Sequence, residues 1–138
     1  MKKLVYPVVS LLVLLASVFS LAACGNSEGA PESAEDSVRA YADPATETTL
    51  QGLSEDDLAK YIRYANAEFK AAVTAAILEA TSTQINDQLG AFQSIEFLST
   101  EEQEGYTIVH YKAIYAKGDV GVRMVFDQDH KVAGQWFE

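Results

Sequence analysis

The fold is decided by residues 106–126, which read YTIVHYKAIYAKGDVGVRMVF. Apolar and polar residues alternate along this stretch, and the alternation is interrupted once, at Lys117-Gly118. Alternation with a period of two is typical of a strand with one buried face, and a short segment containing Gly joins two such strands into a hairpin. The stretch therefore predicts an antiparallel hairpin with strands at 106–116 and 120–127.

Two further strands are predicted on either side of the hairpin, at 94–100 and 131–137, because turn residues separate them from it. A two-residue turn at Lys117-Gly118 and a three-residue loop at 128–130, with His130 left-handed, give a register in which one face is apolar in all four strands. A shift of one residue would destroy this agreement. The predicted pairs include Tyr111 with Met124, Val122 with Trp136 and, across a loop at 101–105, Phe97 with Val109.

Helices are predicted before the strands. Asp43-Pro44 has the residue types that begin a helix, which we expect to run to about residue 50. From residue 54 to 77 apolar residues recur with a period of 3.6, which predicts a long amphipathic helix that Asn66 either leaves whole or splits in two. A shorter helix ends at Gly90. The predicted domain, residues 43–138, is thus α+β, with N-terminal helices packed on a four-stranded antiparallel meander sheet.

The start of the chain has the layout of an export signal. Lys2 and Lys3 precede an apolar run at 4–19, which ends at small residues. Leu21-Ala22-Ala23-Cys24 resembles the lipobox of bacterial lipoproteins, which implies cleavage before Cys24 and a diacylglycerol on its sulfur. We expect residues 1–23 to be a lipoprotein signal peptide and the lipid to hold the chain on the extracytoplasmic face of the cell membrane. The alternative, an uncleaved transmembrane helix, is disfavoured because Pro7 interrupts the run.

Residues 24–42 have the composition of a flexible acidic tether, with Val38 and Tyr41 as the only larger apolar residues. Such a tether spans about 60 Å when fully extended, at ~3.3 Å per residue. A short helix after Ser33 is compatible with the sequence, but no apolar stripe is visible that could dock it. The three expected segments are therefore a signal peptide, a tether and one domain.

Charge and cysteine content exclude several classes of protein. The 138 residues include 20 Asp or Glu and 10 Lys or Arg, which gives a net charge of -10. Such an acidic chain gains nothing from counterion release on a phosphate backbone, so we expect no nucleic-acid partner. The single Cys cannot form a disulfide within the chain.

Several short motifs together are typical of one family. They are Leu50-Gln51-Gly52, Phe69-Lys70-Ala71-Ala72-Val73, Gln88-Leu89-Gly90-Ala91-Phe92, Glu102-Gln103-Glu104-Gly105-Tyr106-Thr107 and residues 125–134, VFDQDHKVAG. The chain resembles the domain of unknown function 3887 family, of the cystatin-like cone in the nuclear transport factor 2-like superfamily, from Ala42 to Glu138. One departure is His130, where the family usually has Gly. The resemblance implies the same α+β fold and no particular activity.

Catalysis is not expected. Related cones house isomerases and dehydratases that aim Asp, Tyr or His into a cavity, but none of the strand positions predicted to face the helices is Asp, Glu or His. Tyrosine, with a pKa near 10, is a poor general base at neutral pH. An enzyme or enzyme accessory with a small-molecule site in the cone cavity remains the alternative. Aromatic side chains that either line a ligand pocket or fill the core are Tyr61, Tyr64, Tyr111, Tyr115 and Trp136.

The face of the sheet turned away from the predicted helices is the candidate partner surface. It is suited to a homodimer or to an anionic group. The alternative is that this face binds no partner and is covered by solvent. No metal site or cofactor is expected, because His110, with Glu96 predicted opposite, lies far from His130, and Asp127 and Asp129 lack the other ligands of a calcium loop. We therefore expect a non-catalytic binding or interaction domain with an unknown protein or small-molecule partner. The residues predicted for this face are His110, Lys112, Arg123, Gln135 and Phe137.

Overall fold

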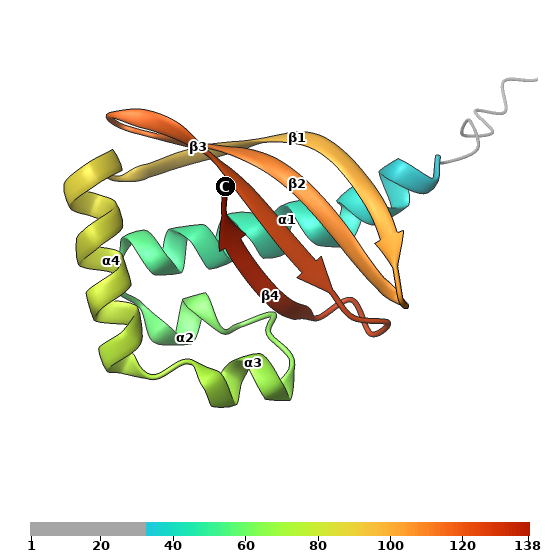
Figure 1. The fold of residues 1–138 in the computed structure, drawn as a ribbon, viewed down its shortest axis with the longest axis horizontal. Coiled ribbons are helices and arrows are strands. Elements are labelled where there is room, and N and C mark those ends of the chain that lie inside the picture. The colour runs from blue at the N-terminus through green and yellow to red at the C-terminus, as the bar shows by residue number, and fades with distance from the viewer. Residues whose placement is uncertain (1–32) are drawn as a thin grey trace, which may run out of the picture. The chain divides into compact units, whose positions relative to one another are not determined.

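The computed structural model describes residues 33–138, so the predicted signal peptide, Cys24 and the start of the predicted tether lie outside the described residues (Figure 1). Four helices precede one antiparallel sheet with the order β1-β2-β3-β4, which confirms the predicted α+β fold and meander. None of the described helices is long and apolar enough to cross a membrane. The elements are α1 (Ala34–Ser54), α2 (Leu58–Tyr61), α3 (Ala67–Ala72), α4 (Ala75–Leu89), β1 (Phe92–Gln103), β2 (Tyr106–Tyr115), β3 (Gly118–Phe126) and β4 (Val132–Phe137).

Helix α1 begins at Ala34, nine residues before the predicted start at Asp43, so the prediction of a tether is wrong over 34–42. Ser33 and Asp36 form a capping box: the Ser33 hydroxyl accepts the Asp36 N–H at 3.1 Å, and the Asp36 carboxylate accepts the Ser33 N–H at 3.3 Å. The helix is held on the sheet by a stripe of mostly small residues with helical spacing. The stripe comprises Val38, Tyr41, Ala42 and Ala45, of which the two alanines are fully buried.

Residues 54–77, predicted to form one long helix, instead contribute to three separate helices. Each of these helices begins at a polar side chain that caps its first turn. Asp57 accepts the backbone N–H of Lys60, Asn66 that of Phe69, and Thr74 that of Ile77. The alternative in which Asn66 splits the helix is therefore confirmed, and Thr74 adds a second break. The predicted helix end at Gly90 is also confirmed.

The hairpin register differs from the predicted one by two residues. The β2–β3 turn is at Ala116-Lys117, so Tyr111 pairs with Val122 rather than with Met124. On β1, Phe97 pairs with Tyr111 rather than with Val109. Because side chains alternate with a period of two, an even shift leaves the same residues facing the helices. Buried residues of the helix-facing side of the strands are Val109, Tyr111, Ala113, Tyr115, Val122, Met124, Phe126 and Val132.

Strand β4 contains a bulge that the sequence does not reveal. The observed pairs are Phe126–Val132, as predicted, and then Val125–Gly134, Met124–Gln135, Arg123–Trp136 and Val122–Phe137. Ala133 is the extra residue, and the odd shift reverses the faces of the last residues of the strand. The predicted faces of Gln135, Trp136 and Phe137 are therefore wrong: Phe137 packs against the core and Trp136 lies on the opposite side. The Trp136 ring covers Gly134, where an added Cβ would lie 2.2 Å from it.

The two faces of the sheet are in different surroundings. In Figure 1, α1 passes behind the sheet, and no described helix lies in front of the face turned to the viewer. We call this uncovered side the outer face. His110, Lys112 and Arg123 lie on it, as predicted, because each alternates with a buried residue of the same strand. The outer face is thus a side of the sheet that the described helices leave open (Figure 1).

Candidate functional site on the outer face of the sheet

A shallow groove of about 250 Å³ lies on the outer face, and we call it the outer groove. Its aromatic walls are Tyr106 on β2 and Trp136 on β4, whose side chains are 42% and 47% exposed. Large apolar side chains with such exposure are uncommon in this domain, since only Ile77 and Leu98 join them among residues 33–138. The residues that line the groove are Gln103, Glu104, Tyr106, Ile108, Arg123, Val125 and Trp136.

Arg123 and Trp136 form one platform in this groove. They are directly opposite each other in the β3–β4 ladder, and the guanidinium carbon lies 4.7 Å from the centroid of the indole ring. A cation–π contact of this kind contributes roughly 0.5–1 kcal/mol at an exposed site. The indole is held from below by the backbone of Gly134. An aromatic side chain fixed in this way offers contact area with little entropy left to lose on binding.

The sequence predicts that the basic side chains of the outer face suit an anionic group. In the structure each of these basic side chains has a carboxylate beside it. His110 lies between Glu101, 3.5 Å from Nε2, and Glu138, 3.3 Å from Nδ1. Arg123 Nε is 3.9 Å from Glu138, and Lys112 pairs with Glu96, so the prediction that Glu96 faces His110 is wrong. The hydrogen bond to Glu96 raises the pKa of Lys112 above its ordinary value. These pairs weaken the case for an anionic ligand.

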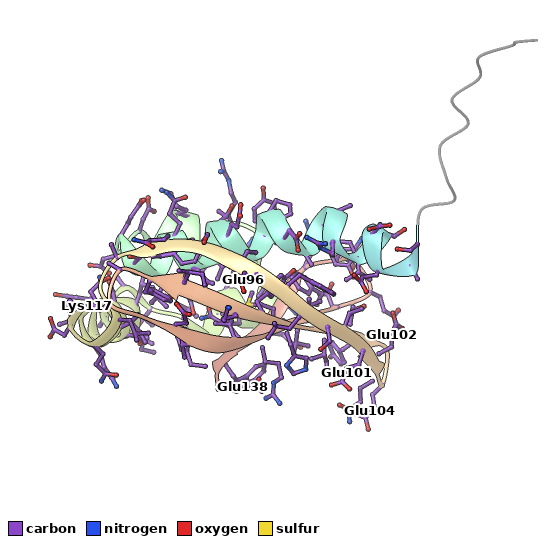
Figure 2. The ribbon with its side chains drawn as sticks, turned by 90° about the horizontal axis from the view of Figure 1, so that it is seen from above. Glu96, Glu101, Glu102, Glu104, Lys117 and Glu138 are labelled. Atoms are coloured by element: carbon purple, nitrogen blue, oxygen red, sulfur yellow. The ribbon has the colours of Figure 1, made fainter. Side chains whose placement is uncertain are left out.

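Carboxylates lie in and beside the groove at one end of the sheet, with Glu104 in its lining. Figure 2 shows Glu101, Glu102 and Glu104 gathered near the tip of the β1–β2 hairpin, with Glu138 nearby. The predicted loop at 101–105 is a two-residue turn, Glu104-Gly105, in which both residues have a positive φ of 53° and 84°. The strand therefore continues through Glu101 and Glu102. We call Glu101, Glu104 and Glu138 the acidic rim; Glu102, which pairs with Thr107, is on the helix-facing side.

The aromatic residues proposed for an internal pocket do not all come together. Trp136 is on the outer face, whereas Tyr111 and Tyr115 are buried in the core and Tyr64 packs against it. Burial raises the pKa of Tyr61 and of Tyr115 to about 12. Both phenols are therefore neutral at physiological pH. This packing favours core filling over a ligand pocket.

A cluster that the sequence analysis missed links α1 to the sheet. The Tyr111 hydroxyl donates to Asp43 Oδ1 at 2.8 Å, and Arg39 donates two hydrogen bonds to Asp43 Oδ2, each of 3.1 Å. Burial, followed by the bond to Asp43, raises the pKa of Tyr111. The Arg39/Asp43 spacing of four residues is a helical signal, but it lies where the composition predicts a tether. Both carboxylate oxygens are engaged, so the cluster acts as a clamp between layers.

The β3–β4 loop is a structural turn. Asp127 Oδ1 accepts the backbone N–H groups of Asp129 and Lys131 at 3.0 and 2.9 Å. His130 has a φ of 58°, which confirms the predicted left-handed residue, and it stacks on Tyr41 with centroids 4.0 Å apart. No group of three or more His, Cys, Asp and Glu side chains within 33–138 is arranged to hold a metal ion.

Comparisons with known proteins agree with this architecture. The NMR structure of a protein from Ruminococcus gnavus ATCC 29149 is 15% identical to this chain, with a TM-score of 0.54. The similarity covers 80% of this chain and 96% of that chain, and at this identity it shows the fold alone. No curated protein matches the chain. The family described as protein of unknown function (DUF3887) matches residues 46–134, from the second half of α1 into β4. Because this match spans more than half of the sequence, the chain belongs to the DUF3887 family.

Proposed function

We propose that the protein is a lipid-anchored bacterial cell-surface protein whose domain is a non-catalytic interaction module, and that the outer groove docks a protein partner. Anchoring is supported by the apolar run at 4–19 and by Leu21-Ala22-Ala23-Cys24 at its end. The interaction role is supported by the outer face, which the helices leave uncovered. The anchor would keep this face in reach of other proteins of the cell surface.

The observation that carries the interaction role is the chemistry of the groove. Trp, Tyr and Arg are the residue types that most often dominate the binding energy of protein interfaces, and here Trp136, Tyr106 and Arg123 line one concavity. Small-molecule sites usually enclose most of their ligand. The outer groove is instead a shallow depression on an open sheet, which suits one anchoring side chain of a protein partner.

Charge determines the kind of partner. Glu104 lines the groove and Glu138 lies beside its lining residue Arg123, while Lys112 and His110 also have carboxylates beside them. A partner with basic residues around an apolar anchor would complement this pattern. Two copies of this chain, docked face to face, would bring two acidic rims together, which disfavours the homodimer. We therefore propose a different protein with a basic surface.

The alternative of an enzyme has less support. A general base must be free to accept a proton from substrate. The one carboxylate that α1 directs at the sheet, Asp43, has both oxygens engaged by Tyr111 and Arg39. The helix-facing positions of the strands are otherwise apolar or aromatic and fill the core.

The test compares two variants with equally exposed apolar side chains, Trp136→Ser on the outer face and Ile77→Ser on α4. Ile77 is 52% exposed. Full-length chains are cross-linked with formaldehyde in intact cells. We expect a discrete adduct of the wild-type chain to fall at least about fivefold in Trp136→Ser, because a central interface aromatic contributes about 2 kcal/mol or more, and to persist in Ile77→Ser. An equal effect of both variants, or an adduct with the mass of two copies, would contradict the proposal.

A further inference from the structure

The two edges of the sheet differ in their protection. The start of the β4 edge is covered by the segment before α3: the Asn66 N–H donates to the carbonyl of Val132, the first residue of β4, and the Val132 N–H donates to the Tyr64 carbonyl, both at 2.9 Å. No strand or loop within residues 33–138 pairs with the free edge of β1. Figure 2 looks onto this edge and shows β1 crossing the front of the view with no other element over it.

Strand β1 is also the most exposed strand. It has 12 residues, none of them buried, whereas its neighbour β2 is half buried. Unpaired N–H and C=O groups along such an edge are a template for another strand, and proteins usually block them with Lys, Pro or bulges. β1 has no Lys or Pro, and its bulges follow Phe92 and Phe97. Beyond the second bulge the ladder is regular from Ser99 to Gln103. This stretch is long enough to pair with an extended segment.

Carboxylates lie beside this edge on both faces of the sheet, together with Arg39, which lies over the Phe97 ring on the helix-facing side. Glu96 and Glu101 lie on the outer face, next to Lys112 and His110. Glu102 pairs with Thr107, which alternates to the helix-facing side, and its carboxylate is 3.4 Å from the Thr107 hydroxyl. An added strand would place alternate side chains next to both groups of carboxylates. Two β1 strands from two copies would instead set carboxylates against carboxylates, so the edge disfavours self-pairing and favours a basic segment.

A cleft lies beside the start of the same strand. It has a volume of about 300 Å³ and is formed between the last turns of α1 and the beginning of β1. Glu47 and Gln51 line it from successive turns of α1, and Glu55 lines it from the C-cap of that helix. The hydrogen bond from Lys60 lowers the pKa of Glu55. A strand paired with Ser99–Gln103 would reach this cleft after roughly seven further residues, at ~3.3 Å each. The cleft offers room and the Glu47 carboxylate for a long basic side chain, while Glu55 is paired with Lys60.

We propose that the free edge of β1 is a second binding site, which takes an extended, Lys- or Arg-rich polypeptide segment by strand addition. Backbone hydrogen bonds along Ser99–Gln103 hold the segment. Carboxylates on both faces select its charge. This site goes beyond the proposed function, since it uses neither Trp136 nor Tyr106 nor Arg123.

The test uses the full chain and an eight-residue peptide of alternating Lys and Val, with a peptide of alternating Glu and Val as the comparison. Amide hydrogen exchange is followed by NMR. We expect the Lys–Val peptide to slow exchange at least about tenfold in Ser99–Gln103 and to leave β4 unchanged, and the Glu–Val peptide to have no effect. Absence of binding by the Lys–Val peptide, or binding without protection of β1, would overturn the proposal.

Matched variants distinguish peptide binding at this edge from a general effect of negative charge and from binding in the outer groove. Glu96→Gln/Glu101→Gln and Glu68→Gln/Glu79→Gln each remove two exposed carboxylates, the second pair from α3 and α4. We expect the first variant to weaken peptide binding at least about fivefold more than the second; equal weakening would contradict a specific edge site. Trp136→Ser should bind the peptide as the wild type does. Loss of peptide binding in Trp136→Ser would refute the edge site, whereas an unchanged cellular adduct in that variant would refute only the proposed role of the groove.

Discussion

Replacing Gly52 with Ala is expected to lower the free energy of unfolding by about 3 kcal/mol, at the upper end of the usual cost of overpacking. Gly52 is buried on α1, where the backbone of α2 crosses it. A Cβ at this position would lie 2.4 Å from the backbone nitrogen of Tyr61 and 2.9 Å from the carbonyl carbon of Lys60. Neither is the end of a flexible side chain, so the two helices must separate. The gain in helix propensity, about 1 kcal/mol, offsets only part of this cost.

Gly118→Ala is the matched control for Gly52→Ala. The nearest atom to a Cβ at Gly118 is Leu89 Cδ2, at 3.8 Å, which is an ordinary van der Waals contact. We expect this variant to remain within about 0.5 kcal/mol of the wild type. Urea denaturation of both variants measures the difference. Equal stability of the two variants would show that α1 and α2 are not in close contact at Gly52.

Replacing Cys24 with Ser is expected to abolish lipidation. The thioether to diacylglycerol requires the sulfur, and two acyl chains are what make such an anchor stable, at about 0.8 kcal/mol per buried methylene. Cells grown with an alkyne fatty acid should label the wild-type chain and leave the variant at background. Mass analysis should also show that the wild-type chain lacks residues 1–23. Equal labelling of both chains, or an unlabelled wild type that retains its first residues, would contradict the proposed anchor.

The early start of α1 changes the geometry of the proposed anchor. Only nine residues, 25–33, separate Cys24 from Ala34. Fully extended, they span about 30 Å at ~3.3 Å each, half the reach that the predicted tether would have. For a chain anchored at Cys24, the domain would therefore work close to the membrane surface, and a protein partner would have to lie in the same layer.

The sequence predicted well which side chains lie on which face of the sheet, because a register error of two residues leaves every side chain on the same face. The turn lies at Ala116-Lys117 rather than at Lys117-Gly118 because tertiary contacts fix it: Lys117 N–H donates to the Leu89 carbonyl at 2.8 Å. Lys117 and Leu89 are far apart in the sequence, so no local sequence pattern indicates this hydrogen bond. The resulting shift of two residues kept His110 and Arg123 on the outer face, so that part of the candidate site could be predicted.

The bulge at Ala133 could not be predicted, since the last strand alternates equally well in either register. The choice depends on Trp136, which covers Gly134 and contacts Arg123 on the neighbouring strand. Because of this one extra residue, Trp136 lies on the outer face, where it lines the outer groove, and Phe137 packs against the core. Residues 34–42 of α1 were missed for a different reason: Ala42 is fully buried there, but an alanine beside Val38 and Tyr41 does not look like an apolar stripe.

Oxidative footprinting of intact cells tests most directly whether a partner occupies the outer groove. Hydroxyl radicals oxidise exposed side chains, and Trp136, Tyr106 and Ile77 have similar exposed fractions in the domain alone, from 42% to 52%. We expect oxidation of Trp136 and Tyr106, relative to Ile77, to be several-fold lower in cells than in the purified full chain. Equal relative oxidation in cells and in the purified chain would show that the outer face is bare, and would contradict the proposed interaction.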